Sequence, residues 1–364
     1  MKNVESMHSQ RNRGWTPVLP FMVFAATVPL LILAVAAVGA SGPPLPNLVA
    51  DPPENVTLET INDQAGKPRL LVRFDGFIHN RGPGALEVRG GERKGRVMKA
   101  RQWVRGLDGV FKPVDPPSGI PLSLVYETAD GHNHWHLKNA ARYTLWNSAR
   151  RAVVATAGKV GFCLEDNEAV SGSGNVDPRY TNDSNRFCHK GRPNVPRITE
   201  GISPGWRDVY ARNLPFQWVD ASDVAPGRYW LGAEVDPKHS IRESDPNDPV
   251  AFAPAPVVID GYTATSATFA DLVTDAPSPV LLDADVTGVP GPRAFRILTP
   301  PAHGHLDAAT GERRTNPVVT YTPDDKFRGS DRFTYVAIDS TSPFPLRPRP
   351  ATVTLRVGPT YIAA

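Results

Sequence analysis

Short apolar runs bounded by turn-forming residues recur along most of the chain. Leu70–Phe74 is one such run, and Gly, Pro and charged residues flank it where a helix would carry capping residues. The chain contains 38 Pro and 30 Gly, residues that interrupt helices and favour turns between strands. The pattern predicts a mostly β protein.

The N-terminal segment departs from this pattern. Residues 16–40 carry no charge and follow Arg11 and Arg13. At about 1.5 Å per residue such a segment can span the ~30 Å core of a bilayer. The small residues at 38–40 suit signal-peptide cleavage equally well. We expect residues 1–40 to be a signal peptide or an N-terminal membrane anchor, and the protein to be secreted or extracytoplasmic.

The remaining 324 or so residues exceed the usual size of one core, which favours two domains, here 41–261 and 262–364. Evenly spaced β signals predict a small antiparallel sandwich in the second domain: Val280–Leu282, Ala294–Leu298, Val318–Tyr321, Phe333–Val336 and Thr352–Val357. Its motifs Thr299–Gly304 and Phe327–Tyr335 resemble the cadherin-like or Ig-like repeats of secreted bacterial proteins. That resemblance implies a spacer or binding module.

The net charge of the chain indicates whether nucleic acid is an expected partner. Forty basic against 37 acidic residues give a net charge of +3, too small and too dispersed to favour nucleic acid. We expect no nucleic-acid partner and no membrane contact beyond the N-terminal segment.

Three histidines at alternate positions form the main candidate site: His132, His134 and His136. Side chains two apart in a strand share a face, so three imidazoles would converge, whereas a helix would spread them around its axis. Imidazole suits zinc, copper, nickel and iron alike, and the ion stays open on this ground. A solvated strand face without metal is the alternative. Trp135 would point to the opposite face, into the core. His303 and His305 repeat the spacing beside a Pro-Pro turn, but two ligands make a poor site.

Cys163 and Cys188 are the only cysteines. In an oxidising compartment they would pair as a disulfide, with metal ligation as the alternative.

Several blocks in register across residues 46–245 resemble the lysyl oxidases. They are the histidine run, Pro46–Pro52, Gly158–Asp166, Gly201–Tyr210, Gln217–Tyr229 and the pair Val235–Pro237 and Glu243–Asp245. The resemblance implies a lysyl-oxidase-like β-sandwich catalytic domain over 41–261, followed by the Ig-like sandwich. Gly131 and Trp206 stand where the animal enzymes usually have Cys, so those disulfides cannot form here.

The resemblance also implies cofactors. Copper would bind the three histidines, and Lys159 and Tyr210 would cross-link into lysine tyrosylquinone. A primary amine, either peptidyl lysine or a smaller amine, would be oxidised by O2 to an aldehyde, with release of ammonia and hydrogen peroxide. Asp208 can share a strand face with Tyr210 and act as a base, although a structural role is the stronger expectation.

The same resemblance implies a calcium site. The residues that match or neighbour its ligands are Asn47, Leu48, Glu243, Asp245 and Asp248, and hard oxygen donors suit calcium. A turn rich in Asp, Asn and Pro is the alternative. For the protein as a whole, a three-histidine zinc hydrolase and a noncatalytic extracellular binding module stay open.

Overall fold

The structure is a computed structural model that describes residues 42–129, 132–159, 161–172, 176–182, 188–288, 291–341 and 349–358. The signal peptide or anchor expected at residues 1–40 lies outside these residues. Within the described part, no helix is both long and apolar enough to cross a bilayer. Strands dominate the described chain, and the mostly β prediction is confirmed.

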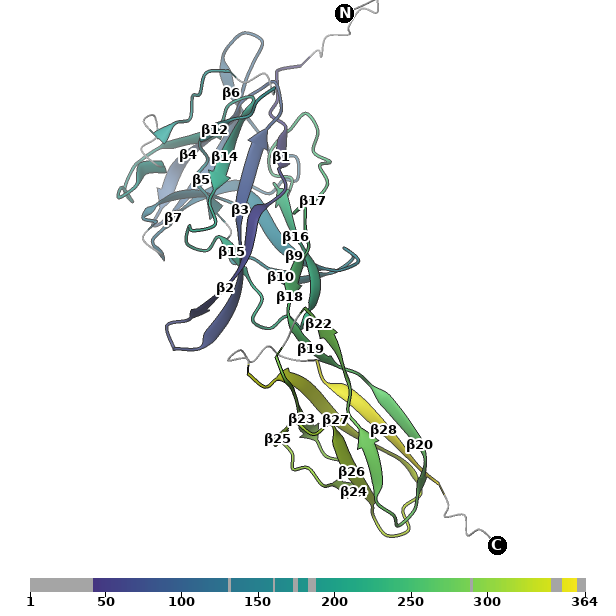
Figure 1. Cartoon of the computed structure of the whole chain (residues 1–364). Helices are drawn as coiled ribbons and strands as arrows, with labels where there is room; N and C mark the ends of the chain where they lie inside the picture. Colours follow the sequence, from purple (N-terminus) through teal and green to yellow (C-terminus); the bar gives the residue numbers. More distant parts are fainter. Residues whose placement is uncertain are drawn as a thin grey trace, which may run out of the picture. The chain divides into compact units, whose positions relative to one another are not determined.

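One seven-stranded antiparallel sheet, here called the histidine sheet, carries His134 and His136. Its strands are β4 (Leu86–Lys94), β5 (Val97–Arg105), β6 (Phe111–Val114), β7 (Leu122–Glu127), β8 (His134–Lys138), β11 (Gly161–Phe162) and β13 (Ile198–Ile202). Strands β4, β5, β6 and β7 are labelled in Figure 1.

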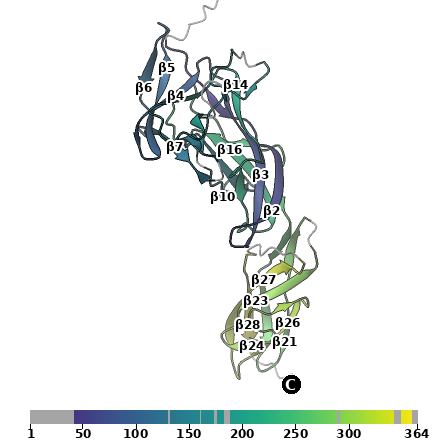
Figure 2. The ribbon, with the colours of Figure 1, turned by 90° about the vertical axis from the view of Figure 1, so that its left-hand side faces the viewer.

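A second sheet, here called the tyrosine sheet, carries Tyr210. Its six strands are β1 (Leu48–Ala50), β2 (Glu54–Asn62), β3 (Pro68–Asn80), β12 (Glu168–Ala169), β14 (Trp206–Tyr210) and β15 (Trp218–Asp220). The run Leu70–Phe74 lies within β3. Figure 2 shows β2 and β3 side by side as an antiparallel hairpin.

A third sheet completes this region with β9 (Ala141–Asn147), β10 (Val153–Thr156), β16 (Gly227–Val235), β17 (Ala251–Phe252) and β18 (Val257–Ile259). One buried cluster draws on all three sheets, including Phe74, Trp135 and Leu231, none of which is exposed to solvent. Burial of such side chains provides about 1.5–3 kcal/mol each.

Residues beyond 260 form further sheets around a separate buried cluster that includes Val280, Phe295 and Tyr321. The strands are β19 (Gly261–Ala264) with β22 (Ala284–Thr287); β20 (Ala267–Val273), β28 (Ala351–Gly358), β27 (Gly329–Asp339), β23 (Arg293–Thr299) and β25 (Arg313–Arg314); and β21 (Ser278–Leu281), β26 (Val318–Pro323) and β24 (Gly304–Leu306).

Each of the five apolar runs expected in this C-terminal region overlaps a strand. The antiparallel expectation fails at one pair, because β20 runs parallel to β28. Such a pair needs a long connection, and residues 274–350 supply it.

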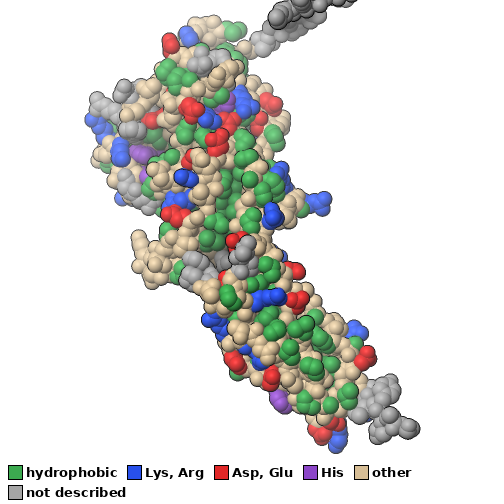
Figure 3. Space-filling model, viewed as in Figure 1, with side chains coloured by type: hydrophobic (Ala, Val, Ile, Leu, Met, Phe, Trp, Pro, Cys, Tyr) green, Lys and Arg blue, Asp and Glu red, His purple; other side chains and the backbone are tan. Residues whose placement is uncertain are grey.

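Charges of both signs are interspersed on the face of the molecule that Figure 3 shows, with no extended patch of one sign.

Candidate metal and cofactor site

His134 and His136 lie on β8 and share one face of that strand. Trp135 between them is fully buried and packs edge-to-face against Tyr126, with ring centres 5.5 Å apart. For these two histidines the strand is present as predicted, and Trp135 belongs to the core as expected.

His132 precedes β8, so the predicted strand does not extend to it. Asn133 has a φ of 49°, a left-handed conformation that Asn tolerates better than most residues. The Asn133 carbonyl accepts hydrogen bonds from the Gly191 N–H and the Tyr126 hydroxyl, each at 2.7 Å. This turn, rather than strand alternation, brings the His132 ring to 5.1 Å from the ring centres of His134 and His136.

The three imidazoles have the geometry of a metal-binding group. One ring nitrogen from each lies within 4.8 Å of the others, and the Nε2 atoms of His134 and His136 are 2.6 Å apart. The buried Nδ1 atoms of His132 and His134 have no hydrogen-bond partner. These features fit an ion that takes neutral nitrogen ligands.

The electrostatics of the cluster keep these rings neutral. Burial, and after it the nearby His132, lower the pKa of His134 to about 4. Burial and then His134 lower the pKa of His136 to about 2. Neutral imidazoles have a free lone pair for a transition metal at ordinary pH.

Lys159 lies just before β11, which pairs with β8 through Gly161 opposite Lys138. A Cβ at Gly161 would lie 2.8 Å from the Cβ of His136, so only glycine permits this close approach. Lys159 is 7% exposed and shares the wall of one open pocket with His132 and His136. The segment that follows β10 is thereby held beside the histidines.

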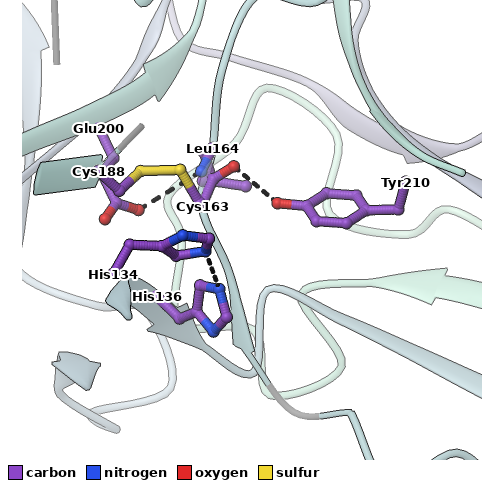
Figure 4. Close-up of a disulfide and its surroundings, with 7 residues drawn as sticks. All are labelled: His134, His136, Cys163, Leu164, Cys188, Glu200 and Tyr210. Carbon is purple, nitrogen blue, oxygen red and sulfur yellow. Dashed lines mark hydrogen bonds between the residues drawn. A yellow bond between two sulfur atoms is a disulfide. The ribbon is translucent and has the colours of Figure 1, made fainter. Parts of the chain in front are cut away.

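Tyr210 ends β14 on the tyrosine sheet and is buried. Its hydroxyl donates a 2.6 Å hydrogen bond to the Cys163 carbonyl (Figure 4). The Lys159 Nζ lies 4.2 Å from the centre of the Tyr210 ring. Burial and then Asp208 raise the pKa of Tyr210, so the phenol stays protonated at ordinary pH.

Cys163 and Cys188 form the expected disulfide. Figure 4 shows that Cys163 both forms the disulfide with Cys188 and provides the carbonyl that accepts the hydrogen bond from Tyr210. The metal-ligating alternative for these cysteines is excluded while the bond is intact, because thiolates are the ligands.

Two buried carboxyl groups belong to the same neighbourhood. Asp208 and Tyr210 share the buried face of β14, and burial raises the pKa of Asp208 although its hydrogen bond with Tyr210 opposes this. Glu200 on β13 is fully buried, and burial raises its pKa too. Its carboxyl group accepts a hydrogen bond from the Leu164 N–H.

Sequence reasoning did not single out Glu200. The available signal was a carboxyl group between Ile198 and Ile202 on the apolar face of a strand. Phe216, which lines the histidine pocket from a separate segment, offered no such signal.

The residues expected to bind calcium come from two distant segments that meet here. The Leu48 N–H donates to the Glu243 carboxyl group, and the buried Asn47 Oδ1 has no partner. Burial raises the pKa of Glu243 to about 8, with Asp236, Asp248 and Asp245 adding to the shift. A divalent cation would relieve this repulsion and give Asn47 a partner, so the donor set fits calcium.

His303 and His305 are not part of the three-imidazole group. The His303 ring stacks on Phe327, with ring centres 4.5 Å apart.

Comparison with known proteins shows what the central region is similar to. Residues 119–253 match the family model described as lysyl oxidase. Lysyl oxidase homolog 1 of Homo sapiens is 36% identical over 115 residues, which cover 31% of this chain and 17% of that protein. Protein-lysine 6-oxidase of Rattus norvegicus is 33% identical over 115 residues, covering 31% of this chain and 24% of that protein.

Lysyl oxidase homolog 2B of Danio rerio is 26% identical over 181 residues, covering 50% of this chain and 18% of that protein. The chain thus spans about a quarter or less of the length of these relatives. Among solved structures, the CupB6 tip adhesin from Pseudomonas aeruginosa matches with 12% identity, covering 87% of this chain and 99% of that chain, at a TM-score of 0.17, too low to indicate a shared fold. The segment 119–253 is therefore similar to the lysyl oxidase family.

Proposed function

We propose that the protein is a copper- and quinone-dependent amine oxidase that acts outside the cytoplasm on primary amines, with peptidyl lysine as the preferred class. The observation that carries the proposal is the approach of Lys159 to Tyr210, with Nζ 4.2 Å from the ring centre. Lys159 also lines the pocket that contains His132 and His136. A three-histidine zinc hydrolase needs no such approach of a lysine to a tyrosine.

In this proposal His132, His134 and His136 bind copper, and Lys159 and Tyr210 are the residues that cross-link. Once formed, lysine tyrosylquinone supplies a carbonyl and an electron sink for amine oxidation, and O2 is the final electron acceptor. The overall reaction consumes an amine, O2 and water and yields an aldehyde, ammonia and hydrogen peroxide.

The protein groups around Tyr210 would orient and protect this centre. The Cys163 carbonyl fixes the hydroxyl of Tyr210 before cross-linking, and the disulfide to Cys188 fixes the segment that carries this carbonyl. Burial of Tyr210 excludes water from its ring. Asp208 is a candidate to exchange a proton at the Tyr210 hydroxyl, because the two side chains are buried on the same face of β14, and burial and then Asp208 raise the pKa of Tyr210.

We also propose that Glu243, Asp245, Asp248 and the Asn47–Leu48 segment bind calcium as a structural site. The buried Asn47 Oδ1 without a partner supports this. Calcium that stays bound through extensive dialysis, measured by elemental analysis, would support the site, and loss of that calcium in Glu243→Gln would assign it. A wild-type protein that retains none would contradict the assignment.

A tryptic mass map of the copper-loaded protein tests the cofactor. We expect one peptide pair joined between Lys159 and Tyr210, and its absence from Tyr210→Phe. Separate, unmodified peptides in the wild type would favour the zinc hydrolase or a noncatalytic binding module.

Peroxide release from a primary amine tests the activity. His134→Ala and Tyr210→Phe should each reduce it by at least about a thousandfold, because each removes a component of cofactor formation. Tyr229→Phe is a matched control, since this buried tyrosine hydroxyl donates to the Ala225 carbonyl, its one hydrogen-bond partner among the described residues. Amine turnover that survives Tyr210→Phe would exclude the quinone mechanism.

A further inference from the structure

The open pocket beside the histidines is lined by both apolar and charged side chains. Its volume is about 310 Å³, within the range of small-molecule sites. Val125, Ala129 and Phe216 supply apolar surface, and Glu127 and Lys138 supply opposite charges. Lys159, His132 and His136 lie in the same pocket.

Glu127 is the one carboxylate among the described residues that line this pocket. It ends β7, directly opposite His134 on β8. Its Oε1 accepts hydrogen bonds from the N–H groups of Thr128 and Ala129, each at 2.8 Å. These backbone donors fix the carboxylate. Among the described residues Glu127 has no ion-pair partner, whereas Glu92, for example, pairs with Lys99.

A carboxylate that is held by backbone donors and has no cationic partner is a site for a cation with N–H donors. An apolar wall beside it suits the aliphatic stem of the same molecule. An alkylammonium ion, including the side chain of a peptidyl lysine, combines both features.

We propose that Glu127 binds the ammonium group of the incoming amine and so sets the preference of the pocket for cationic alkylamines. This inference rests on the proposed amine oxidase function and names a substrate-binding residue for it. Lys138, on the same wall, opposes cation entry and limits the affinity. Removal of the Glu127 charge should therefore raise the KM for a cationic amine, and removal of the Lys138 charge should lower it.

Steady-state kinetics on the full-length, copper-loaded protein test the pair, with n-butylamine as the substrate. Glu127→Gln keeps an oxygen acceptor for both backbone N–H groups, so the loop is preserved. We expect its KM to rise about tenfold while kcat changes less than twofold, as for the loss of one charge-assisted contact. Lys138→Gln should lower KM about threefold.

Glu92→Gln is the matched control. It removes one negative charge from an exposed side chain that pairs with Lys99 and does not line this pocket. We expect its KM to equal that of the wild type. An equal rise in KM for Glu92→Gln and Glu127→Gln would assign the effect to net charge and overturn the proposal.

Binding provides a readout independent of turnover. Calorimetry with N,N-dimethylbutylammonium, a protonated tertiary amine that keeps an N–H donor but cannot form an imine, should show weaker binding to Glu127→Gln and tighter binding to Lys138→Gln. Binding of the neutral n-butanol should be the same in both variants and the wild type. Unchanged affinity for the cation in Glu127→Gln would overturn the inference.

The two proposals fail differently. If the wild type releases peroxide from n-butylamine and Glu127→Gln has an unaltered KM, the inference is wrong and the amine oxidase function stands. If the cross-linked wild type oxidises no amine, the function fails, and calorimetry still decides whether Glu127 binds an alkylammonium ion.

Discussion

At the residue scale, Gly76 on β3 shows how closely this strand approaches the side chains packed against it beside Tyr210. Gly76 pairs with Tyr210 in the register of β3 and β14. A Cβ at Gly76 would lie 2.2 Å from the Tyr143 hydroxyl and 2.9 Å from the Gln217 Nε2. Tyr143 is buried and cannot move away without displacing the core.

We predict that Gly76→Ala lowers the free energy of unfolding by about 2 kcal/mol, the usual cost of overpacking. It should also reduce formation of the proposed Lys159–Tyr210 cross-link, because β14 must shift. Chemical denaturation and the mass map measure the two effects. Gly91→Ala is the control, since a Cβ there meets nothing within 4 Å. Equal stabilities of the two variants would contradict the packing argument.

In the C-terminal region, the buried carboxylate of Asp331 is the residue whose replacement we expect to affect stability most clearly. It is 3% exposed and accepts hydrogen bonds from the N–H groups of Ala302 and His303, each at 2.9 Å, and from the Tyr321 hydroxyl at 3.0 Å. Burial opposes its ionisation, but these backbone and side-chain donors outweigh burial and lower its pKa.

A lowered carboxyl pKa contributes stability that is present above the unfolded value of 3.8 and is lost as the pH falls through the folded value. We predict that Asp331→Asn lowers stability at pH 7 by about 2 kcal/mol. The difference from the wild type should shrink below pH 3.8. Thermal unfolding from pH 2.5 to 7 measures this, and a difference that does not depend on pH would contradict it.

At the element scale, the disulfide joins the end of β11 to the segment before β13. Cys163 and Cys188 are 25 residues apart, and closure of such a loop restricts the unfolded chain by about 3 kcal/mol on a chain-entropy model. We predict that the double variant Cys163→Ser/Cys188→Ser loses about this amount and forms less cross-link. The backbone carbonyl of Cys163 remains available to Tyr210. Unchanged stability and cross-link yield would show that β11 is held by pairing with β8 alone.

Much of the strand pattern could be predicted from the sequence, because apolar runs between turn residues encode half-buried strands. Short elements such as β24 and β25 could not, since two or three residues carry no period. The alternate spacing of the histidines predicts that His132 lies on the strand. The positive φ of Asn133, which depends on contacts with Tyr126 and Gly191, was not visible in the sequence.

The candidate site could be predicted from the sequence only where its residues lie close together in the chain. The histidines form a local motif, whereas Lys159 and Tyr210 entered only through family resemblance. Glu200 and Phe216 reach the site through long-range packing, which single-sequence patterns do not encode.

At the scale of the whole molecule, the described residues form two separate buried clusters, from which we predict two cooperative units divided near residue 261. Six of the seven tryptophans lie between residues 42 and 261, and none lies beyond. Tryptophan fluorescence therefore reports the central region, and far-UV circular dichroism reports both.

We predict that the two unfolding curves of the wild type do not coincide, because each core can unfold by itself. Asp331→Asn should shift only a part of the circular dichroism transition and leave the fluorescence midpoint unchanged. Coincident curves that shift together would show one cooperative unit.

The disulfide lies inside the segment that Lys159 and Tyr210 delimit. If these two residues are joined in the mature protein, the chain contains one covalent ring within another, and only the inner ring opens on reduction. Maturation would then leave a permanent mark on the denatured chain: after reduction, the mature form should still migrate faster than the immature form on a denaturing gel. A denaturing gel can therefore detect the cross-link as a change in chain connectivity. The sample can be unfolded and stripped of copper beforehand, and no substrate is needed.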